Sequence, residues 1–457
     1  MCPPCYSNHC NVLYIPLDEA AALLFSSPPM ATTITDSQKP FSLDPYHVSE
    51  EFGFILPAPL AELPPYYQPW MDIAQHVTEL IYSHMLRSHI LKMPLLNTQL
   101  LESHRELRLA HLALSVMTMG YVWQEGEDDT VKMLPRNLAI PYCEVSQRLG
   151  LPPILTHADA VLANWRKRDP QGLFDMENLE LLVTLPGGDS VRGFFMVTLL
   201  VELAAVPAIK SIPLVINGVQ CDDAETVTRA LEEFSQAIQG MTDALKLMHV
   251  YVKPEVFYGI MRIYLSGWKD NSSMPAGLVY EGVQAEPMEY SGGSAAQSSL
   301  LHCFDELLGV KHEAMSGILK MSFPVRVNVL STCTGAFLTR MRNYMPPSHK
   351  RLIQDISLQP SLRGFVQQQA CEPLTAAFQL CVTKLLALRS YHINVVSRFI
   401  IVPAARARQL RNQGNISQEE TVSRAPTALE EKGTGGSGIM SFLKTVRDRT
   451  RDVFNLK

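Results

Sequence analysis

One repeating apolar pattern constrains the fold of this chain more than any other feature of the sequence. Between residues 227 and 248, apolar side chains recur at alternating spacings of four and three residues, as they do along one face of an α-helix. The same spacing recurs from Leu374 to Phe399, and Pro403 is expected to end that second helix. Two long helices without strand-like alternation nearby predict a large all-α domain. The first face consists of Val227, Leu231, Phe234, Ile238, Met241, Leu245 and Met248.

The pattern changes along the 457 residues, which exceed the roughly 150 residues of a typical domain. Residues 1–45 are rich in Pro, Ser and Thr and predict a disordered leader. Residues 46–184 mix proline-rich turns with short helical stretches, which predicts a smaller, mostly helical N-terminal domain. Residues 185–457 form the predicted large all-α domain. The predicted fold class is therefore mainly α.

Two segments of the large domain break the helical pattern. Residues 318–335 are apolar and β-branched, and we interpret them as an insertion between helices. Residues 404–438 are polar, and loops of this length are usually functional or disordered. The end of that loop, Gly433–Gly438, matches Gly-x-Gly-x-x-Gly, but no strand precedes it, so a dinucleotide site is not predicted. We expect either a plain connection into an amphipathic helix over residues 439–454 or glycine N–H groups that bind a carboxylate or phosphate.

Charge and hydropathy exclude several classes of protein. The net charge is −6, whereas a nucleic-acid-binding protein is expected to have a broad positive surface. The most apolar stretch, Phe194 to Val206, is interrupted by Glu202 and closed by Pro207, so it predicts a buried helix rather than a membrane span. No secretory signal is recognised. We expect a soluble, cytoplasmic monomer without membrane or nucleic-acid partners.

One histidine on an apolar helix face has two interpretations, a core residue or a haem ligand. His392 lies in phase with the apolar face of the second long helix, three residues after Arg389. A lone histidine on such a face is usually a core residue that hydrogen-bonds a carbonyl. Haem, however, needs one imidazole in a dry, helix-lined cavity and a cation near a propionate. The spacing alone leaves both interpretations open.

Several blocks of sequence then add a resemblance. From about Tyr46 to the C-terminus, the chain resembles the indoleamine 2,3-dioxygenase family. His157, Thr198 and Pro275–Leu278 resemble the second vertebrate paralogue of that family more than the first. The blocks that carry the resemblance are Arg262–Trp268, Gly292–Gln297, Tyr344–His349, Leu388–His392 with Phe399–Pro403, and Lys432–Gly436.

The resemblance implies an oxidoreductase with one haem b per chain and O₂ as co-substrate. Members of the family open the indole C2–C3 bond of L-tryptophan, or of a related indoleamine, to give N-formylkynurenine in the first step of the kynurenine pathway. They have a small N-terminal domain and a large all-α haem domain, which agrees with the division above. Because the iron-bound oxygen attacks an electron-rich indole, no residue is expected to act as a catalytic acid or base.

The resemblance also assigns roles to residues. His392 would be the proximal iron ligand, and Arg389 would meet a haem propionate directly or through Asp305. Arg262 would bind the substrate carboxylate with two parallel hydrogen bonds. The alternative for Arg389 is a surface ion pair, which contributes little. The alternative for Arg262 is a helix-surface arginine, which its apolar neighbours disfavour, and His349 is expected to be structural. The remaining assignments are Ser294 and Ala295 in the wall near the iron, Phe194, Phe257 and Tyr258 against the indole, His157 and Thr198 in the distal pocket, and Thr434 in a loop that closes over the substrate.

Two features point away from robust tryptophan turnover. His157 stands where the first paralogue has tyrosine, and an imidazole beside the indole should weaken binding, so we predict low activity with a high KM. Tyr142 and Tyr280 match a loose phosphotyrosine docking pattern. The alternative function is therefore a haem-binding signalling or regulatory protein that recruits phosphotyrosine-binding proteins. That alternative requires the two tyrosine side chains to be exposed, and we expect Tyr280 to lie in an exposed interdomain loop.

Overall fold

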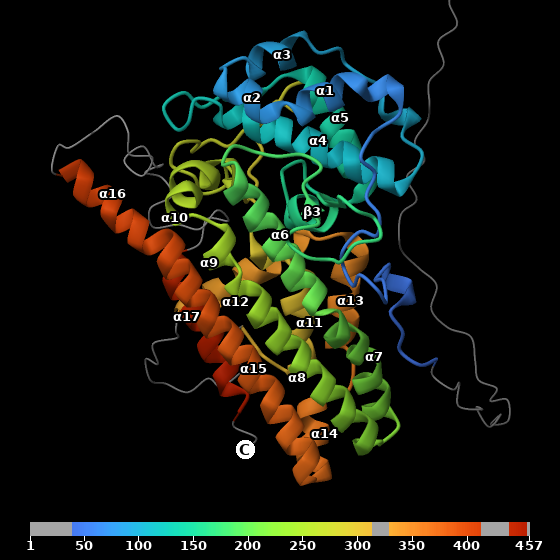
Figure 1. Ribbon diagram of the computed structural model, residues 1–457. Helices are drawn as coiled ribbons and strands as arrows, with labels where there is room; N and C mark the ends of the chain where they lie inside the picture. Colours follow the sequence, from blue (N-terminus) through green and yellow to red (C-terminus); the bar gives the residue numbers. More distant parts are fainter. Residues whose placement is uncertain (1–38, 313–328, 413–437, 455–457) are drawn as a thin grey trace, which may run out of the picture. The chain divides into compact units, whose positions relative to one another are not determined.

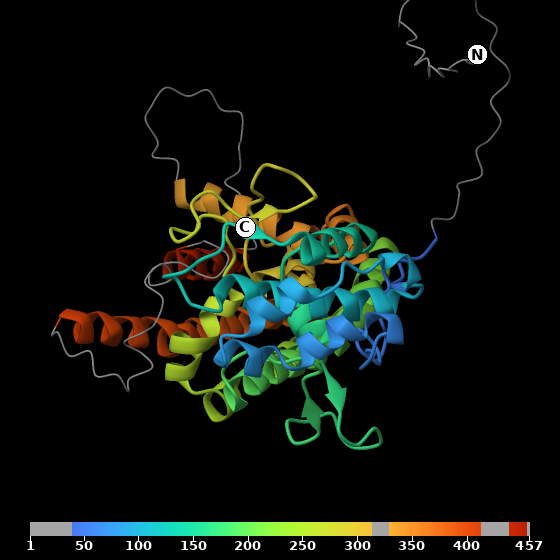
Figure 2. The same ribbon diagram turned by 90° about the horizontal axis from the view of Figure 1, so that it is seen from above.

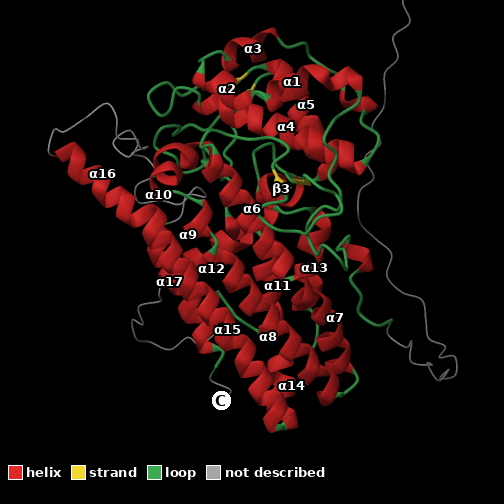
Figure 3. Ribbon diagram, viewed as in Figure 1, coloured by secondary structure: helices red, strands yellow, loops and turns green. Residues whose placement is uncertain are grey.

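Helices provide nearly all the secondary structure in the computed structural model of this chain (Figure 1; Figure 3). The structure describes residues 39–312, 329–412 and 438–454. Residues 40–457 form one compact unit, so the predicted boundary between residues 184 and 185 remains a prediction. The prediction of a mainly α fold is confirmed.

The first group of helices surrounds α4 (His104–Trp123), which is buried along nearly its whole length. Ser103 and Glu106 form a capping box at its start, in which each side chain accepts a hydrogen bond from the backbone N–H of the other residue. A helix buried on all sides must satisfy its polar side chains internally. Around α4 lie α1 (Gln68–Gln75), α2 (Val77–Tyr82), α3 (Leu86–Lys92) and α5 (Arg136–Leu149), together at the top of Figure 1. The π-helix η4 (Ala158–Ala163) also contacts α4.

The second group is built on α8 (Ala224–Lys246), the helix with the predicted long apolar face. Asp223 caps this helix by accepting a hydrogen bond from the Thr226 N–H. The predicted face is buried from Val227 to Met241, where α8 packs against α6, α7 and α15. The helices of this group are α6 (Asp189–Ala204), α7 (Val206–Gln220), α11 (Ser299–Leu308), α12 (Val329–Met341), α13 (Pro347–Ser357), α14 (Leu362–Gln369), α15 (Glu372–Val396) and α17 (Ile439–Asp452).

Short elements connect the two groups. Two pairs of strands occur in the described residues: β1 (Met133–Leu134) runs parallel to β4 (Val279–Tyr280), and β2 (Arg166–Lys167) runs antiparallel to β3 (Leu179–Glu180). The β2–β3 hairpin projects from the helices in Figure 2. Strands of two residues cannot form a core of their own. The short helices are η1 (Asp44–Tyr46), η2 (Pro65–Tyr67), η3 (Thr98–Leu100), α9 (Met248–Tyr251), α10 (Pro254–Val256), η5 (Phe257–Met261), η6 (Arg262–Leu265), η7 (Ala295–Gln297) and η8 (Arg342–Tyr344).

The second predicted long helix does not end at Pro403. It passes from α15 through a π-helix, η9 (Ser397–Ile401), into α16 (Val402–Asn412), so residues 404–412 are helical rather than part of a loop. Pro403 is the second residue of α16, and inside a continuous helix its missing N–H removes one backbone hydrogen bond. The wider π-turn before it accommodates the break. The rest of the predicted loop, residues 413–437, lies outside the described residues.

Two other predicted segments are described only in part. Of the predicted insertion, residues 329–335 belong to α12 and residues 318–328 lie outside the described residues. Of the predicted leader, residues 1–38 lie outside them as well. Its last residues pack on α7, where the Phe41 N–H donates to Asn217 Oδ1 over 2.8 Å. The predicted amphipathic helix near the C-terminus is confirmed as α17.

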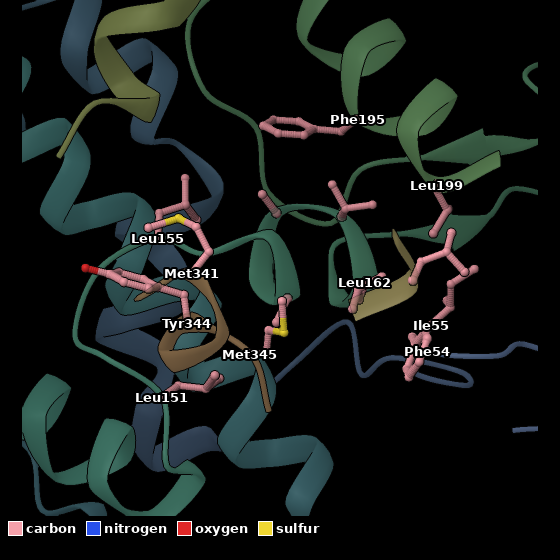
Figure 4. Close-up of a cluster of buried hydrophobic side chains, with 14 of the residues drawn as sticks. Phe54, Ile55, Leu151, Leu155, Leu162, Phe195, Leu199, Met341, Tyr344 and Met345 are labelled. Carbon is pink, nitrogen blue, oxygen red and sulfur yellow. The ribbon is translucent and has the colours of Figure 1, made fainter. Parts of the chain in front are cut away.

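A cluster of buried side chains joins the two groups of helices (Figure 4). Phe54 and Ile55 from the N-terminal segment lie near Leu162 on η4 and Leu199 on α6. Segments distant in sequence therefore share one core. Two helical stretches, Asp189–Gln220 and Glu372–Asn412, are long and apolar enough to cross a membrane by length and composition alone. Because α6, α7 and α15 pack against α8, we assign these stretches to that core.

Candidate functional site

A cavity of about 340 Å³ lies among η4, α6, α8, η5, η6, α11, α15 and α17. One water needs only ~10–15 Å³ of such space, so the cavity has room for a large organic group. Its walls are mostly apolar, and the apolar face of α17 closes part of it. Most of the predicted site residues line it: His157, Phe194, Thr198, Phe257, Arg262, Ser294, Ala295, Asp305, Arg389 and His392. Thr434 lies outside the described residues.

His392 faces this cavity from near the end of α15. No hydrogen bond to its ring is recorded within the described residues, which leaves the core interpretation without the carbonyl partner it requires. Burial, together with the nearby positive charge of Arg389, lowers the pKa of His392 to about 4. The imidazole is therefore neutral at pH 7, the state in which histidine binds a metal.

Arg389 is held in a buried ion pair rather than on the surface. Its Nη2 lies 2.7 Å from both carboxylate oxygens of Asp305 on α11, and its Nη1 donates to Thr450 on α17. Burial alone would raise the pKa of Asp305, but Arg389 and His312 outweigh it and hold that pKa at about 2. The pair therefore remains ionised and ties α11, α15 and α17 together at the cavity wall.

Arg262 is a buried cation in the cavity wall. It begins η6 and is 1% exposed, so the alternative of a helix-surface arginine is wrong. Burial lowers its pKa to about 10, which leaves it charged at neutral pH. The ring of Tyr258 lies 5.3 Å from its guanidinium carbon, in a cation–π arrangement. A buried cation beside an apolar cavity favours an anionic group on the ligand.

Tyr258 itself departs from the prediction. It does not line the cavity but packs against Ala404 and Ala407 of α16. Phe257, one position earlier, points into the cavity instead, because adjacent residues of a helical turn face different directions. Tyr258 thus supports Arg262 rather than contacting a ligand ring.

Aromatic rings and small residues shape the rest of the cavity. The rings of Phe194 and Phe257 lie 4.9 Å apart, and Phe257 also meets Phe399 edge to face. The glycine-rich wall before Ser294 needs its glycines, because a Cβ at Gly292 would lie 2.1 Å from the Leu265 carbonyl oxygen. The backbones on the two sides therefore touch, which brings Ser294 beside the segment that carries Arg262.

The chain matches a family model over residues 42–453, and the description of that model is indoleamine 2,3-dioxygenase. The chain belongs to the indoleamine 2,3-dioxygenase family. It is 50% identical to indoleamine 2,3-dioxygenase 2 of Homo sapiens, over 90% of this chain and 95% of that protein. Indoleamine 2,3-dioxygenase 1 of Rattus norvegicus is 44% identical over the same shares. A protein of the abalone Haliotis madaka named myoglobin is 37% identical over 90% of this chain and 98% of its own length.

Membership in the indoleamine 2,3-dioxygenase family confirms the resemblance, including the greater likeness to the second paralogue than to the first. The family depends on haem and O₂. The cavity fits a haem, because the neutral imidazole of His392 faces a mostly apolar space and a fixed cation, that of Arg389, stands in its wall. Two other histidines line the cavity, but His157 contacts Glu202 and His302 contacts the Ala296 carbonyl oxygen. The second histidine of a family block, His349, lies outside the cavity in α13, 4.7 Å from the Phe54 ring.

Sequence reasoning missed several cavity residues of this family member, and Glu202 is the acidic one among them. Glu202 is 4% exposed and lines the cavity, and its Oε1 lies 2.9 Å from His157 Nε2 and 2.5 Å from Ser298 Oγ. In the sequence, Glu202 had been considered only as an interruption of an apolar stretch. The sequence did contain a signal for its place in the cavity: Glu202 follows the predicted pocket residue Thr198 by four positions, which puts both on the same side of α6.

The two tyrosines of the signalling alternative are fully buried, so the expected exposure of Tyr280 is wrong. Tyr142 shares a 2.6 Å hydrogen bond with Ser115, and the Tyr280 hydroxyl donates to the Pro153 carbonyl oxygen over 2.6 Å. Each hydroxyl therefore already has a partner inside the core. A kinase could reach neither without opening the fold.

Proposed function

We propose that this chain is a haem-dependent dioxygenase that opens the indole C2–C3 bond of L-tryptophan, or of a close indoleamine, to give N-formylkynurenine. One observation carries the proposal: a neutral histidine, His392, and a buried cation, Arg262, face the same apolar cavity. An amino acid with an aromatic ring matches that combination, since its carboxylate needs a cation and its ring needs apolar walls. Membership in the family supports the reaction.

The residues of this chain would bind and orient the reactants. His392 would hold the iron of one haem b per chain, and Arg389, fixed by Asp305, would face a propionate. The haem supplies the centre at which O₂ is bound and activated. Arg262 would bind the substrate carboxylate through its planar fork, while Phe194 and Phe257 would pack against the ring and exclude water. We assign no proton transfer to any of these side chains.

The proposal includes weak turnover of tryptophan. His157 and Glu202 add a polar pair to a cavity that must accept an apolar ring. The imidazole has a partner in Glu202, but a polar pair facing an apolar ring still costs binding energy. We further propose that the protein is a cytoplasmic monomer acting at the first step of tryptophan catabolism.

Oxygen binding without catalysis is a second candidate, because one relative at 37% identity carries the name myoglobin. Storage of O₂ needs a haem ligand and an apolar pocket but no buried cation for a carboxylate. Arg262 is buried and lines the cavity, which favours the dioxygenase. Signalling through Tyr142 and Tyr280 is not favoured, since both are buried.

An absorption spectrum of the haem-reconstituted, reduced full-length protein tests the proposal. We expect the bands of a histidine-ligated haem, a shift of these bands on addition of L-tryptophan, and formation of N-formylkynurenine with O₂. His392→Ala should lose the haem spectrum, whereas Arg262→Ala should keep it and lose the shift. The control is His89→Ala, which changes an exposed histidine.

Three results would oppose the proposal in different ways. If the wild type does not bind haem, the proposed cofactor is wrong. A haem spectrum that ignores millimolar tryptophan would favour oxygen binding alone. A normal haem spectrum in His392→Ala would assign the iron to another residue.

A further inference from the structure

His302 on α11 connects the glycine-rich wall of the cavity to the short helix η8. Its Nε2 lies 2.9 Å from the Ala296 carbonyl oxygen, and its Nδ1 lies 3.2 Å from Arg342 Nε. Ala296 lines the cavity, and Arg342 is the first residue of η8. Arg342 also donates from Nη2 to Glu306 Oε1 over 2.7 Å, which holds its guanidinium group in place. A relay of three side chains therefore ends on a backbone carbonyl group of the wall.

The two contacts determine the state of the His302 ring. A guanidinium N–H can only donate, so Nδ1 must accept the hydrogen bond from Arg342. A carbonyl oxygen can only accept, so Nε2 must carry the hydrogen that it shares with Ala296. Burial, reinforced by the charge of Arg342, lowers the pKa of His302 to about 4. The ring is therefore neutral at pH 7 and makes both bonds at once, which fixes its orientation.

The same helix also holds the other end of the wall segment, residues 291–297. The Ser291 N–H donates to the Tyr344 hydroxyl oxygen over 2.7 Å, and Tyr344 is the last residue of η8. Between the two ends, Gln297 Nε2 donates to the Gly292 carbonyl oxygen over 2.9 Å and closes the segment on itself. The segment is thus tied to η8 in two places, and the second tie depends on a single imidazole ring.

The end of the segment that His302 holds belongs to the proposed haem site. Ser294, Ala295 and Ala296 line the cavity that His392 faces, and the family resemblance places the first two near the iron. Ser294 Oγ accepts a hydrogen bond from the Ala296 N–H over 3.2 Å, so a movement of Ala296 is passed on to Ser294. Such movements matter, because a displacement of about 1 Å in a site can lower a reaction rate about 100-fold.

We propose that His302, anchored by Arg342, is a positioning residue that sets how closely the wall at Ala296 approaches a ligand on the haem iron. The proposal rests on the proposed function, since it takes the haem to be held in this cavity by His392. His302 acts through the backbone of the wall and exchanges no proton with the substrate. A core histidine that served the fold alone would change the stability of the protein but not the surroundings of the iron.

The stretching vibration of carbon monoxide on the reduced haem of the full-length protein tests the proposal. This band reports the packing and polarity around the iron, and its measurement needs no turnover. We expect one narrow band in the wild type and a displaced or broadened band in His302→Leu, which removes both ring contacts. Because Arg262 stays in place, the kcat of His302→Leu for L-tryptophan should fall about tenfold at a nearly unchanged KM.

Two conservative variants separate the two contacts of His302. The amide nitrogen of His302→Gln reaches about as far as Nε2 and can donate to Ala296, so this variant should keep the wild-type band. His302→Asn reaches only as far as Nδ1, so it meets Arg342 but not Ala296, and its band should match that of His302→Leu. The matched control is Tyr67→Phe, which removes a buried side chain's hydrogen bond to the Asn97 carbonyl oxygen. It should lower the stability and leave the band unchanged.

The outcomes separate this proposal from the one on which it rests. If the three His302 variants bind haem and give the wild-type band, the positioning role is refuted and the proposed function stands. The positioning role also fails if His302→Asn restores the band and His302→Gln does not, or if none of the three binds haem, because His302 then serves stability alone. If the bands change as expected but the wild type does not convert tryptophan, the positioning role stands and the proposed function fails. A wild type that binds no haem overturns both.

Discussion

Two buried histidine–carboxylate pairs lie side by side in this fold and differ in what surrounds them. His111 and Asp159 are 2.8 Å apart and fully buried, whereas His157 and Glu202 are 2.9 Å apart and border the cavity. In the sealed pair, Asp159 also accepts hydrogen bonds from Thr156, and the second nitrogen of His111 contacts a serine hydroxyl. The open pair leaves one oxygen to the cavity. The same chemistry is therefore structural in one place and available to a ligand in the other.

The sharpest test of this comparison is to remove one carboxylate from each pair. Asp159→Ala leaves Arg108 buried without its counter-charge and His111 without its hydrogen-bond partner, which should lower the free energy of unfolding by about 3–5 kcal/mol. Glu202→Ala should cost less, because water entering the cavity can solvate His157. Urea unfolding of both variants measures the difference. Equal losses would show that the open pair is as sealed as the other.

A third histidine, His349, extends the comparison because no carboxylate among the described residues is recorded in contact with it. Burial, reinforced by the charge of Arg108, lowers its pKa to about 3. The unfolded chain, with a histidine pKa near 6.5, therefore takes up a proton first as the pH falls. Between about pH 6.5 and 3, the stability should drop by up to about 1.4 kcal/mol per pH unit for this residue alone.

His349→Phe should make the free energy of unfolding less dependent on pH over this range, since the proton uptake disappears while the ring contact with Phe54 remains. His89→Phe, at an exposed position, is the control and should keep the wild-type slope. The measurement is urea unfolding at several pH values. An unchanged slope in His349→Phe would assign the acid sensitivity to other buried histidines, such as His302, whose pKa is about 4.

The smallest expected effect concerns the open pair alone. His157→Tyr replaces an imidazole with a larger aromatic face while keeping a hydroxyl that can reach Glu202. Aromatic contacts of this kind contribute about 0.5–1.5 kcal/mol, so the KM for L-tryptophan should fall about two- to tenfold. Steady-state kinetics with the haem-loaded variant measure it. If KM does not change, His157 is not the cause of weak tryptophan binding.

Periodicity predicted the helices well because it reports burial directly. The apolar face of α8 and the position of His392 in phase with α15 follow from spacings within one helix. Pro403 was misjudged because the π-turn before it depends on packing, which no local pattern encodes. The loose phosphotyrosine pattern at Tyr142 and Tyr280 likewise says nothing about burial, and both tyrosines proved to be core residues.

The site was predictable only where a motif or a helix face carried it. Tyr258 and Phe257 adjoin each other, and only the three-dimensional fold shows that one faces the cavity and the other supports Arg262. The importance of Glu202 comes from His157, forty-five positions earlier in the chain, and from Ser298, ninety-six positions later. Contacts over such distances have no signature in a single sequence.

The origin of the cavity walls has a consequence for biosynthesis. The first residue of the lining is Leu155, and the last is Val446 on α17. A ribosome delivers these residues in order, so a nascent chain exposes the apolar side of α15 until α17 has emerged and docked. Stalled or truncated translation products that lack α17 should therefore bind chaperones. A prosthetic group should enter the cavity only after nearly the whole chain has been synthesised.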